Sequence, residues 1–190
     1  MILTIKPTNQ HGLVTVATTV PDWSDANTYG KARYIETLLI ADIGVSKRFN
    51  RDMKKLRRAV VTLMQALNLY LYQLDIRLIV VDVVEMIAHN VTLERFAGYK
   101  REKFHEFPAH DLAILISSTY EGGIAYVNGI CGRSAVGIIG FFADAPMEYA
   151  SIFFHELAHL LGLSHDAKND CSCRQTSLDS DEGCLKIEYV

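Results

Sequence analysis

The pattern of apolar and polar residues predicts a strand, a long helix and a second strand near the start of the chain. Residues 33–42 (RYIETLLIAD) and 76–87 (IRLIVVDVVEMI) are dense apolar runs bounded by charge, which is typical of buried strands. Residues 46–72 between them have a helical pattern, because apolar residues recur there at steps of three and four. This apolar face comprises Met53, Leu56, Val60, Met64, Leu67 and Leu71.

The residue pattern in the middle of the chain predicts one more helix and three strands. Thr92 can cap a helix that ends near Phe104. Residues 111–118 (DLAILISS) form a third strand, and residues 123–130 and 134–142 form two short strands separated by a Cys-Gly turn.

A last helix is predicted from Pro146 to Leu161. Proline is tolerated in a first helical turn, where its missing N–H costs nothing, and Gly162 should end the helix. Strands and helices that alternate in this order predict an α/β layered domain with a mixed sheet. We expect residues 1–30, which carry loop signals, to be a leader or propeptide remnant, and residues 31–190 to be one domain.

Composition narrows the class of protein. The chain has 190 residues, of which 49% are hydrophobic and 22% charged, and this suits one globular domain. The net charge of −3 gives no reason to expect a nucleic-acid partner or an anionic membrane surface. No apolar run approaches the roughly 18 residues of a membrane helix. We therefore expect no nucleic-acid and no membrane partner. We also expect the chain to be a monomer.

The cysteines leave the redox compartment open. An even count is compatible with disulfides in an oxidising compartment or with free buried thiols, and no C-x-x-C zinc spacing is present. The sequon Asn90-Val91-Thr92 agrees with secretion. The four cysteines are Cys131, Cys171, Cys173 and Cys184.

The strongest chemical signal is His155-Glu156-Leu157-Ala158-His159, an H-E-x-x-H motif on the last predicted helix. Residues four apart share one helical face, so both imidazoles can reach one zinc ion at about 2.0–2.1 Å. Zinc lowers the pKa of a bound water to about 7, and Glu156 is close enough to take its proton as general base. The alternative is a buried helix whose histidines hydrogen-bond to their surroundings.

A third zinc ligand follows at the spacing that the site requires. Gly162 can adopt a positive φ and turn the chain, which brings His165 back toward His155 and His159. Three ligands leave the fourth position of zinc open for water, as in catalytic sites. Of the other histidines, we expect His89, His105 and His110 to be surface or structural.

These residues resemble a known family. HELAHLLGLSHD, residues 155–166, is similar to the extended metzincin motif H-E-x-x-H-x-x-G-x-x-H, and Asp166 resembles the adamalysin (reprolysin) branch of venom and salivary metalloproteinases. The resemblance covers roughly residues 33–184. It implies a metzincin-like zincin domain, with a mixed twisted sheet, a long active-site helix and a cysteine-rich C-terminal tail. It also implies a secreted zinc endopeptidase that acts on extracellular proteins.

The resemblance implies further site residues. Residues 134–141 match the edge strand along which a protein or peptide substrate lies extended, and an unpaired edge suits main-chain hydrogen bonds. Glu36 and Asp111 match two carboxylates of a surface calcium site, the alternative being solvated charges at strand ends. Cys173 and Cys184 match a disulfide pair.

The chain departs from the family after Cys184. The family places a methionine two residues further on, whereas Leu185 and Lys186 follow here, and the chain stops at Val190. We interpret the chain as a C-terminally truncated catalytic domain. One alternative is a zinc-binding but inactive or weakly active homologue that acts as a binding protein or toxin. Another is a structural zinc domain, against which Glu156 and the open fourth position argue.

Overall fold

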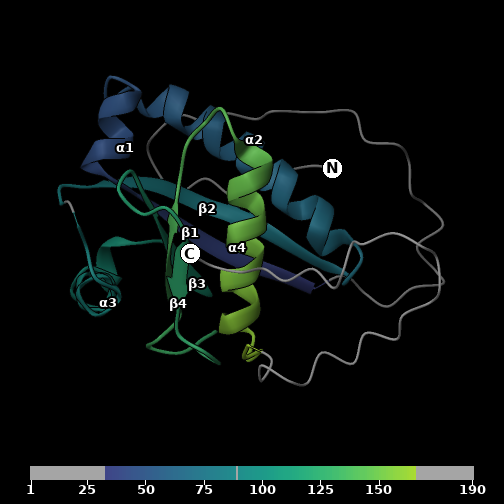
Figure 1. Ribbon diagram of the computed structural model, residues 1–190. Coiled ribbons are helices and arrows are strands. Elements are labelled where there is room, and N and C mark those ends of the chain that lie inside the picture. The colour runs from purple at the N-terminus through teal and green to yellow at the C-terminus, as the bar shows by residue number, and fades with distance from the viewer. Residues whose placement is uncertain (1–32, 89, 166–190) are drawn as a thin grey trace, which may run out of the picture.

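The computed structural model describes residues 33–88 and 90–165, which form one five-stranded sheet with helices packed on it (Figure 1). The strand order is β2-β1-β3-β5-β4, with β4 antiparallel to β5 and all other neighbours parallel. The strands are β1 (Arg33–Asp42), β2 (Ile76–Met86), β3 (Leu112–Ser117), β4 (Gly123–Ala125) and β5 (Val136–Gly140). The predicted α/β class with a mixed sheet is confirmed.

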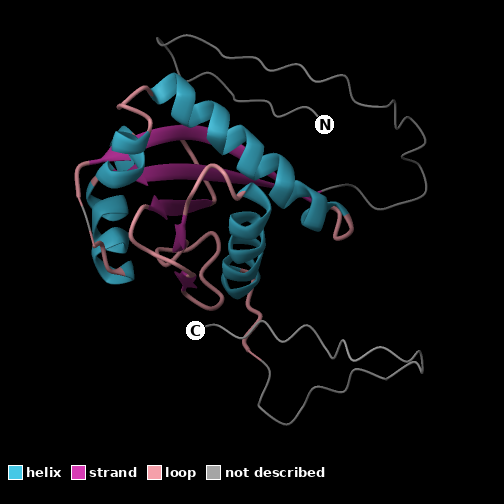
Figure 2. Ribbon diagram, turned by 45° about the horizontal axis from the view of Figure 1, so that its top comes forward, coloured by secondary structure: helices cyan, strands magenta, loops and turns pink. Residues whose placement is uncertain are grey.

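The helices cover both faces of this sheet (Figure 2). Alternate residues of a strand face opposite sides, and β1 shows which helices lie on each. Leu39 belongs to the core that contains α2 (Met53–Tyr72) and α4 (Pro146–Leu160). Leu38 belongs to the core that contains α3 (Leu93–Glu102). Two short helices, α1 (Ile43–Arg48) and η1 (Phe104–Glu106), complete the described elements.

The helix predicted over residues 46–72 is wrong in its first part, because the structure breaks it into α1 and α2. Asn50 and Arg51 adopt left-handed φ values of 54° and 56°, which end the first helix. Asp52 then caps α2, since its carboxylate accepts hydrogen bonds from the backbone amides of Lys54 and Lys55 at 3.0 and 3.1 Å. The whole predicted apolar face lies within α2, so the break does not disturb the core.

The prediction that residues 134–141 form an edge strand is also wrong. β5 lies between β3 and β4, so both of its sides are paired. All five of its residues are buried, which is typical of an interior strand. The edges of the sheet are β2 and β4.

Several expectations fall outside the described residues. These are the leader, the cysteine-rich tail, and the segment in which Leu185 and Lys186 replace the expected sequence. Within residues 33–88 and 90–165, no helix is long and apolar enough to cross a membrane.

Candidate metal centre

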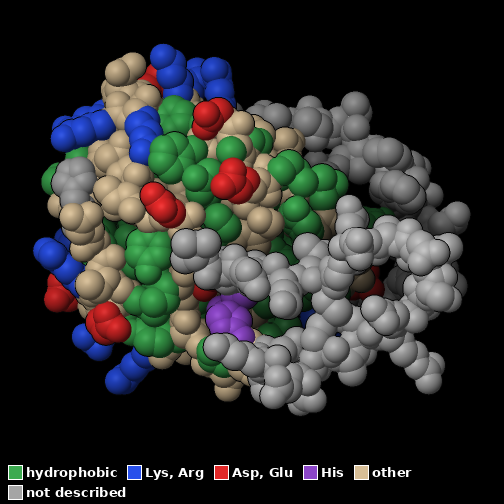
Figure 3. Space-filling model, viewed as in Figure 1, with side chains coloured by type: hydrophobic (Ala, Val, Ile, Leu, Met, Phe, Trp, Pro, Cys, Tyr) green, Lys and Arg blue, Asp and Glu red, His purple; other side chains and the backbone are tan. Residues whose placement is uncertain are grey.

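Two of the predicted ligands lie in the C-terminal half of α4. The opposite side of that helix is fixed in the core by the fully buried side chains of Phe153, Leu157 and Leu160. His155 and His159 are one turn apart and only half-buried, so they point away from this core. A patch of histidine is visible at the surface where α4 ends (Figure 3).

The turn after α4 brings the third histidine back to the first two. Gly162 has a φ of +102°, and its N–H donates to the carbonyl of His159 at 2.9 Å. The N–H of Leu163 donates to the carbonyl of Ala158 at 3.0 Å, which completes a Schellman turn. As a result, Nε2 of His165 lies 3.0 Å from Nε2 of each helical histidine.

The three imidazoles fit a zinc ion by their chemistry. Nδ1 of His159 lies 2.7 Å from the carbonyl oxygen of Leu163, so its N–H donates there and its Nε2 lone pair faces the other rings. Burial, together with the nearby His159 and His165, lowers the pKa of His155 to about 4, which leaves it neutral and able to bind a metal. Nitrogens that share one ion at about 2.0–2.1 Å lie about 3 Å or slightly more from one another.

Glu156 lies beside these histidines and is 2% exposed. Its Oε2 is buried and has no hydrogen-bond partner in the described part of the chain. Burial raises the pKa of this carboxyl to about 7, which is the range of a general base at neutral pH. The structure therefore brings the predicted base and the three predicted ligands into one place.

Gly123 of β4 packs directly on Glu156, a contact that the sequence pattern did not predict. A Cβ atom at this position would lie 2.5 Å from Cγ and 2.6 Å from Oε1 of Glu156. A glycine inside a strand can mark a close approach of another group, and this was the available signal. The edge strand β4 and the candidate base are thus in contact.

The two residues of the predicted calcium site are also neighbours. The N–H of Glu36 donates to Oδ2 of Asp111 at 2.8 Å, and the N–H of Asp111 donates to the carbonyl of Glu36 at 2.8 Å. Among the described residues, however, the group of three or more potential metal ligands is the histidine triad. The calcium site stays a prediction.

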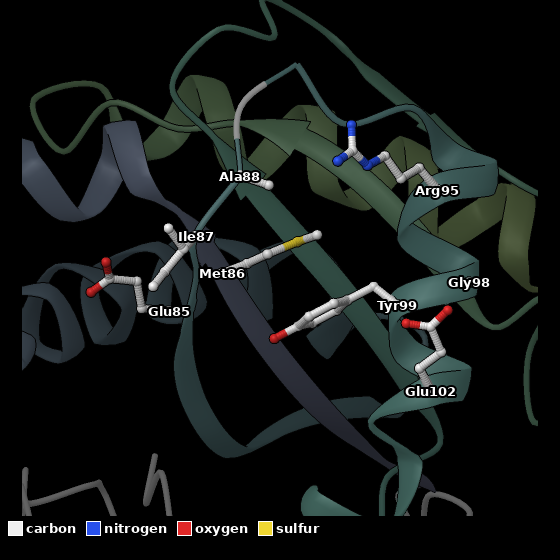
Figure 4. Close-up of a pocket in the computed structure, with 8 residues that line it drawn as sticks. All are labelled: Glu85, Met86, Ile87, Ala88, Arg95, Gly98, Tyr99 and Glu102. Carbon is white, nitrogen blue, oxygen red and sulfur yellow. The ribbon is translucent and has the colours of Figure 1, made fainter.

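A separate pocket of about 640 Å³ lies between the end of β2 and α3. Figure 4 shows Tyr99 reaching across it from α3 toward Met86. Its rim carries charges of both signs, from Arg95 and from the carboxylates of Glu85 and Glu102. It has no part in the histidine cluster.

A long helix with two histidines, a third histidine beyond a glycine turn and a buried glutamate define a zinc-dependent peptidase of the metzincin type. Residues 33–188 match the family described as Reprolysin (M12B) family zinc metalloprotease. The chain belongs to this family, whose members are metalloendopeptidases.

Individual relatives agree. The chain is similar to the snake venom metalloproteinase trimerelysin-2 of Protobothrops flavoviridis, at 30% identity over 83% of this chain and 82% of that protein. It is equally similar to a zinc metalloproteinase/disintegrin of Bitis gabonica, but spans only 51% of that longer protein. A chain in a solved chaperone–substrate complex matches 72% of this chain and 24% of its own length, with a TM-score of 0.52 and 18% identity, which shows a shared fold alone.

Proposed function

We propose that this chain is a secreted endopeptidase that hydrolyses peptide bonds of extracellular proteins, with Glu156 as its general base. The observation that carries the proposal is the convergence of three imidazole Nε2 atoms, 3.0 Å from His165 to each of the other two, beside a buried carboxyl. The relative named as a snake venom metalloproteinase supports an extracellular site of action.

The roles of the residues follow from their chemistry. His155, His159 and His165 would hold the zinc through neutral nitrogens. When bound, zinc lowers the pKa of a water molecule to about 7 and polarises the carbonyl group under attack. Glu156 takes the proton of the attacking water, and its pKa of about 7 lets it release that proton again to the leaving amine.

The edge strand β4 is the surface that supports peptide binding best. The N–H of Gly140 donates to the carbonyl of Gly122 at 2.9 Å, so these two residues form a hydrogen-bonded pair. Such pairs alternate along an antiparallel ladder, and the backbone groups of Gly123 and Ala125 therefore face outward. An extended peptide that pairs with them would pass directly beside Glu156.

A second candidate function is a zinc-loaded binding protein or toxin with little or no peptidase activity. It is favoured by Leu185 and Lys186, which stand where the resembled family has its methionine turn.

Proteolysis of an unfolded protein substrate, with and without a metal chelator, distinguishes these functions. We expect one zinc per chain, cleavage that the chelator abolishes, and recovery when zinc is added back. Glu156→Ala should retain zinc without activity, whereas His159→Ala should lose most of the zinc. Full zinc occupancy without cleavage would favour the binding protein, and a wild-type chain that binds no zinc would overturn both functions.

A further inference from the structure

The C-terminal end of α4 has no unpaired carbonyl group, although the last four carbonyls of a helix have no partner within the helix itself. Backbone N–H groups of residues 161–163 donate hydrogen bonds to the first three of these carbonyls, and a residue outside the helix and its turn donates to the fourth. In order, the pairs are Leu157 with Leu161 at 2.9 Å, Ala158 with Leu163 at 3.0 Å, His159 with Gly162 at 2.9 Å and Leu160 with Ile130 at 3.1 Å.

The outside partner is the segment Tyr126–Ile130, which continues directly from β4. Besides the bond from Ile130, the N–H of Asn128 donates to the carbonyl of His159 at 2.8 Å. The carbonyl of this candidate ligand therefore accepts two hydrogen bonds, one from the turn and one from the segment. One stretch of backbone thus connects the outward-facing edge of β4 with the helix end that carries His159.

Asn128 adopts a left-handed backbone conformation, with a φ of 58°. Its side chain also lies against the glycine turn, since Oδ1 is 3.5 Å from where a Cβ of Gly162 would be. A left-handed residue redirects its neighbouring peptide groups, and asparagine and glycine adopt this conformation more readily than other residues. The direction of the Asn128 N–H toward His159 therefore depends on this conformation.

We propose that Asn128 is a positioning residue of the metal centre. It acts through the hydrogen bond from its backbone N–H to the carbonyl of His159, and so fixes the distance between the helical histidines and His165. It touches neither the substrate nor the reacting atoms. The inference rests on the zinc centre of the proposed function and adds the residue that orients it.

The chain contains a matched control for the test. Asn50 is also an exposed asparagine, with a φ of 54°, but it lies between α1 and α2 rather than beside α4. Asn50→Val and Asn128→Val therefore introduce the same backbone strain at two places, only one of which contacts the metal centre. Asn50→Gly and Asn128→Gly remove the side chains without that strain.

Zinc affinity, measured by competition with a chromophoric chelator, is the primary measurement. We expect Asn128→Val to weaken zinc binding about tenfold, the equivalent of the strain of a left-handed valine. Asn128→Ala should weaken it less, and Asn128→Gly should restore wild-type affinity. The visible absorption of the cobalt-substituted protein should change in Asn128→Val alone, while both valine variants should unfold at similarly lowered temperatures.

Wild-type zinc affinity in Asn128→Val, or an equal loss in Asn50→Val, would overturn the positioning role. If Asn128→Val does not fold, the same comparison between Asn128→Ala and Asn128→Gly decides, and equal zinc affinities there would overturn it. A wild-type chain that fails to bind zinc is a different result, because it refutes the proposed function itself.

Discussion

The two edge strands of the sheet have opposite characters. β2 is 11 residues long, contains an extra residue at Val81 where its register with β1 shifts, and carries an ion pair between Asp82 and Arg57 at 3.0 Å. β4 has three residues and packs a glycine on Glu156. Bulges and charges discourage pairing with other chains, so the long edge is protected, whereas the short edge beside the candidate base is unpaired among the described residues.

This comparison shows that a hollow by itself does not identify the site. The 640 Å³ pocket lies at the end of the protected edge, where acidic and basic side chains line one hollow and the described residues form no cluster of metal ligands. The histidines and the glutamate lie at the other edge. The two regions differ in which side chains lie beside an unpaired strand edge. Only β4 has the candidate base and the candidate metal ligands beside it.

The largest difference between the two edges should appear when a carboxylate is removed from each. Glu156→Gln should lower kcat by about 10³-fold with zinc retained, because the amide cannot accept a proton. Glu85→Gln, at the end of β2, should leave kcat unchanged. Steady-state kinetics with metal analysis measures both, and an active Glu156→Gln protein would contradict the assignment of the base.

A pair of glycines gives a second, smaller contrast. Gly123→Ala should lower kcat about 10- to 100-fold, because the new Cβ displaces Glu156 and small misplacements of a catalytic group are costly. Gly98→Ala beside the pocket meets no atom within 4 Å and should leave kcat unchanged. Equal kinetics for the two variants would show that the contact between β4 and Glu156 is unimportant.

Gly98→Ala should instead change stability. Alanine in the interior of α3 should raise the free energy of unfolding by about 0.5–1 kcal/mol, since glycine loses more backbone entropy on folding. Urea denaturation measures this difference. A destabilised Gly98→Ala protein would mean that α3 packs well only when residue 98 has no side chain.

The smallest effect should come from the ion pair on the protected edge. Asp82→Ala should lower the free energy of unfolding, because it removes this ion pair. The loss should be only about 0.2–1 kcal/mol, since solvent screens a partly exposed pair. Peptidase activity should not change. Measuring unfolding at low and high salt provides the control, since the difference from wild type should shrink as salt rises.

The features that were predicted best from the sequence are those that depend on residues close together in the chain, such as the bounds of a strand or the end of a helix. β1 has the predicted bounds, and the helix of the H-E-x-x-H motif ends at the predicted glycine, because caps and periodicity act within a few residues. The break at Asn50 escaped prediction, since neither residue of the left-handed pair is glycine. The order of β4 and β5 depends on pairing between distant segments, which hydrophobic periodicity does not encode.

The contact between Gly123 and Glu156 could not be predicted for the same reason. The two residues are far apart in sequence, and they meet only because β4 adds antiparallel to β5 beside α4. A glycine in a short strand signals a close approach, but it does not say to which group. The candidate base was therefore identified from its motif, and its surroundings from the fold.

The direction of α4 has an electrostatic consequence. Peptide dipoles align along a helix and leave about half a negative elementary charge at its C-terminal end. The histidine cluster lies at that end, where His159 belongs to the last turn. A dication held there would gain from this dipole by about 0.3–1 kcal/mol, whereas an anion would be disfavoured. The polarity of the helix therefore favours the same sign of charge as the lone pairs of the three neutral imidazoles do.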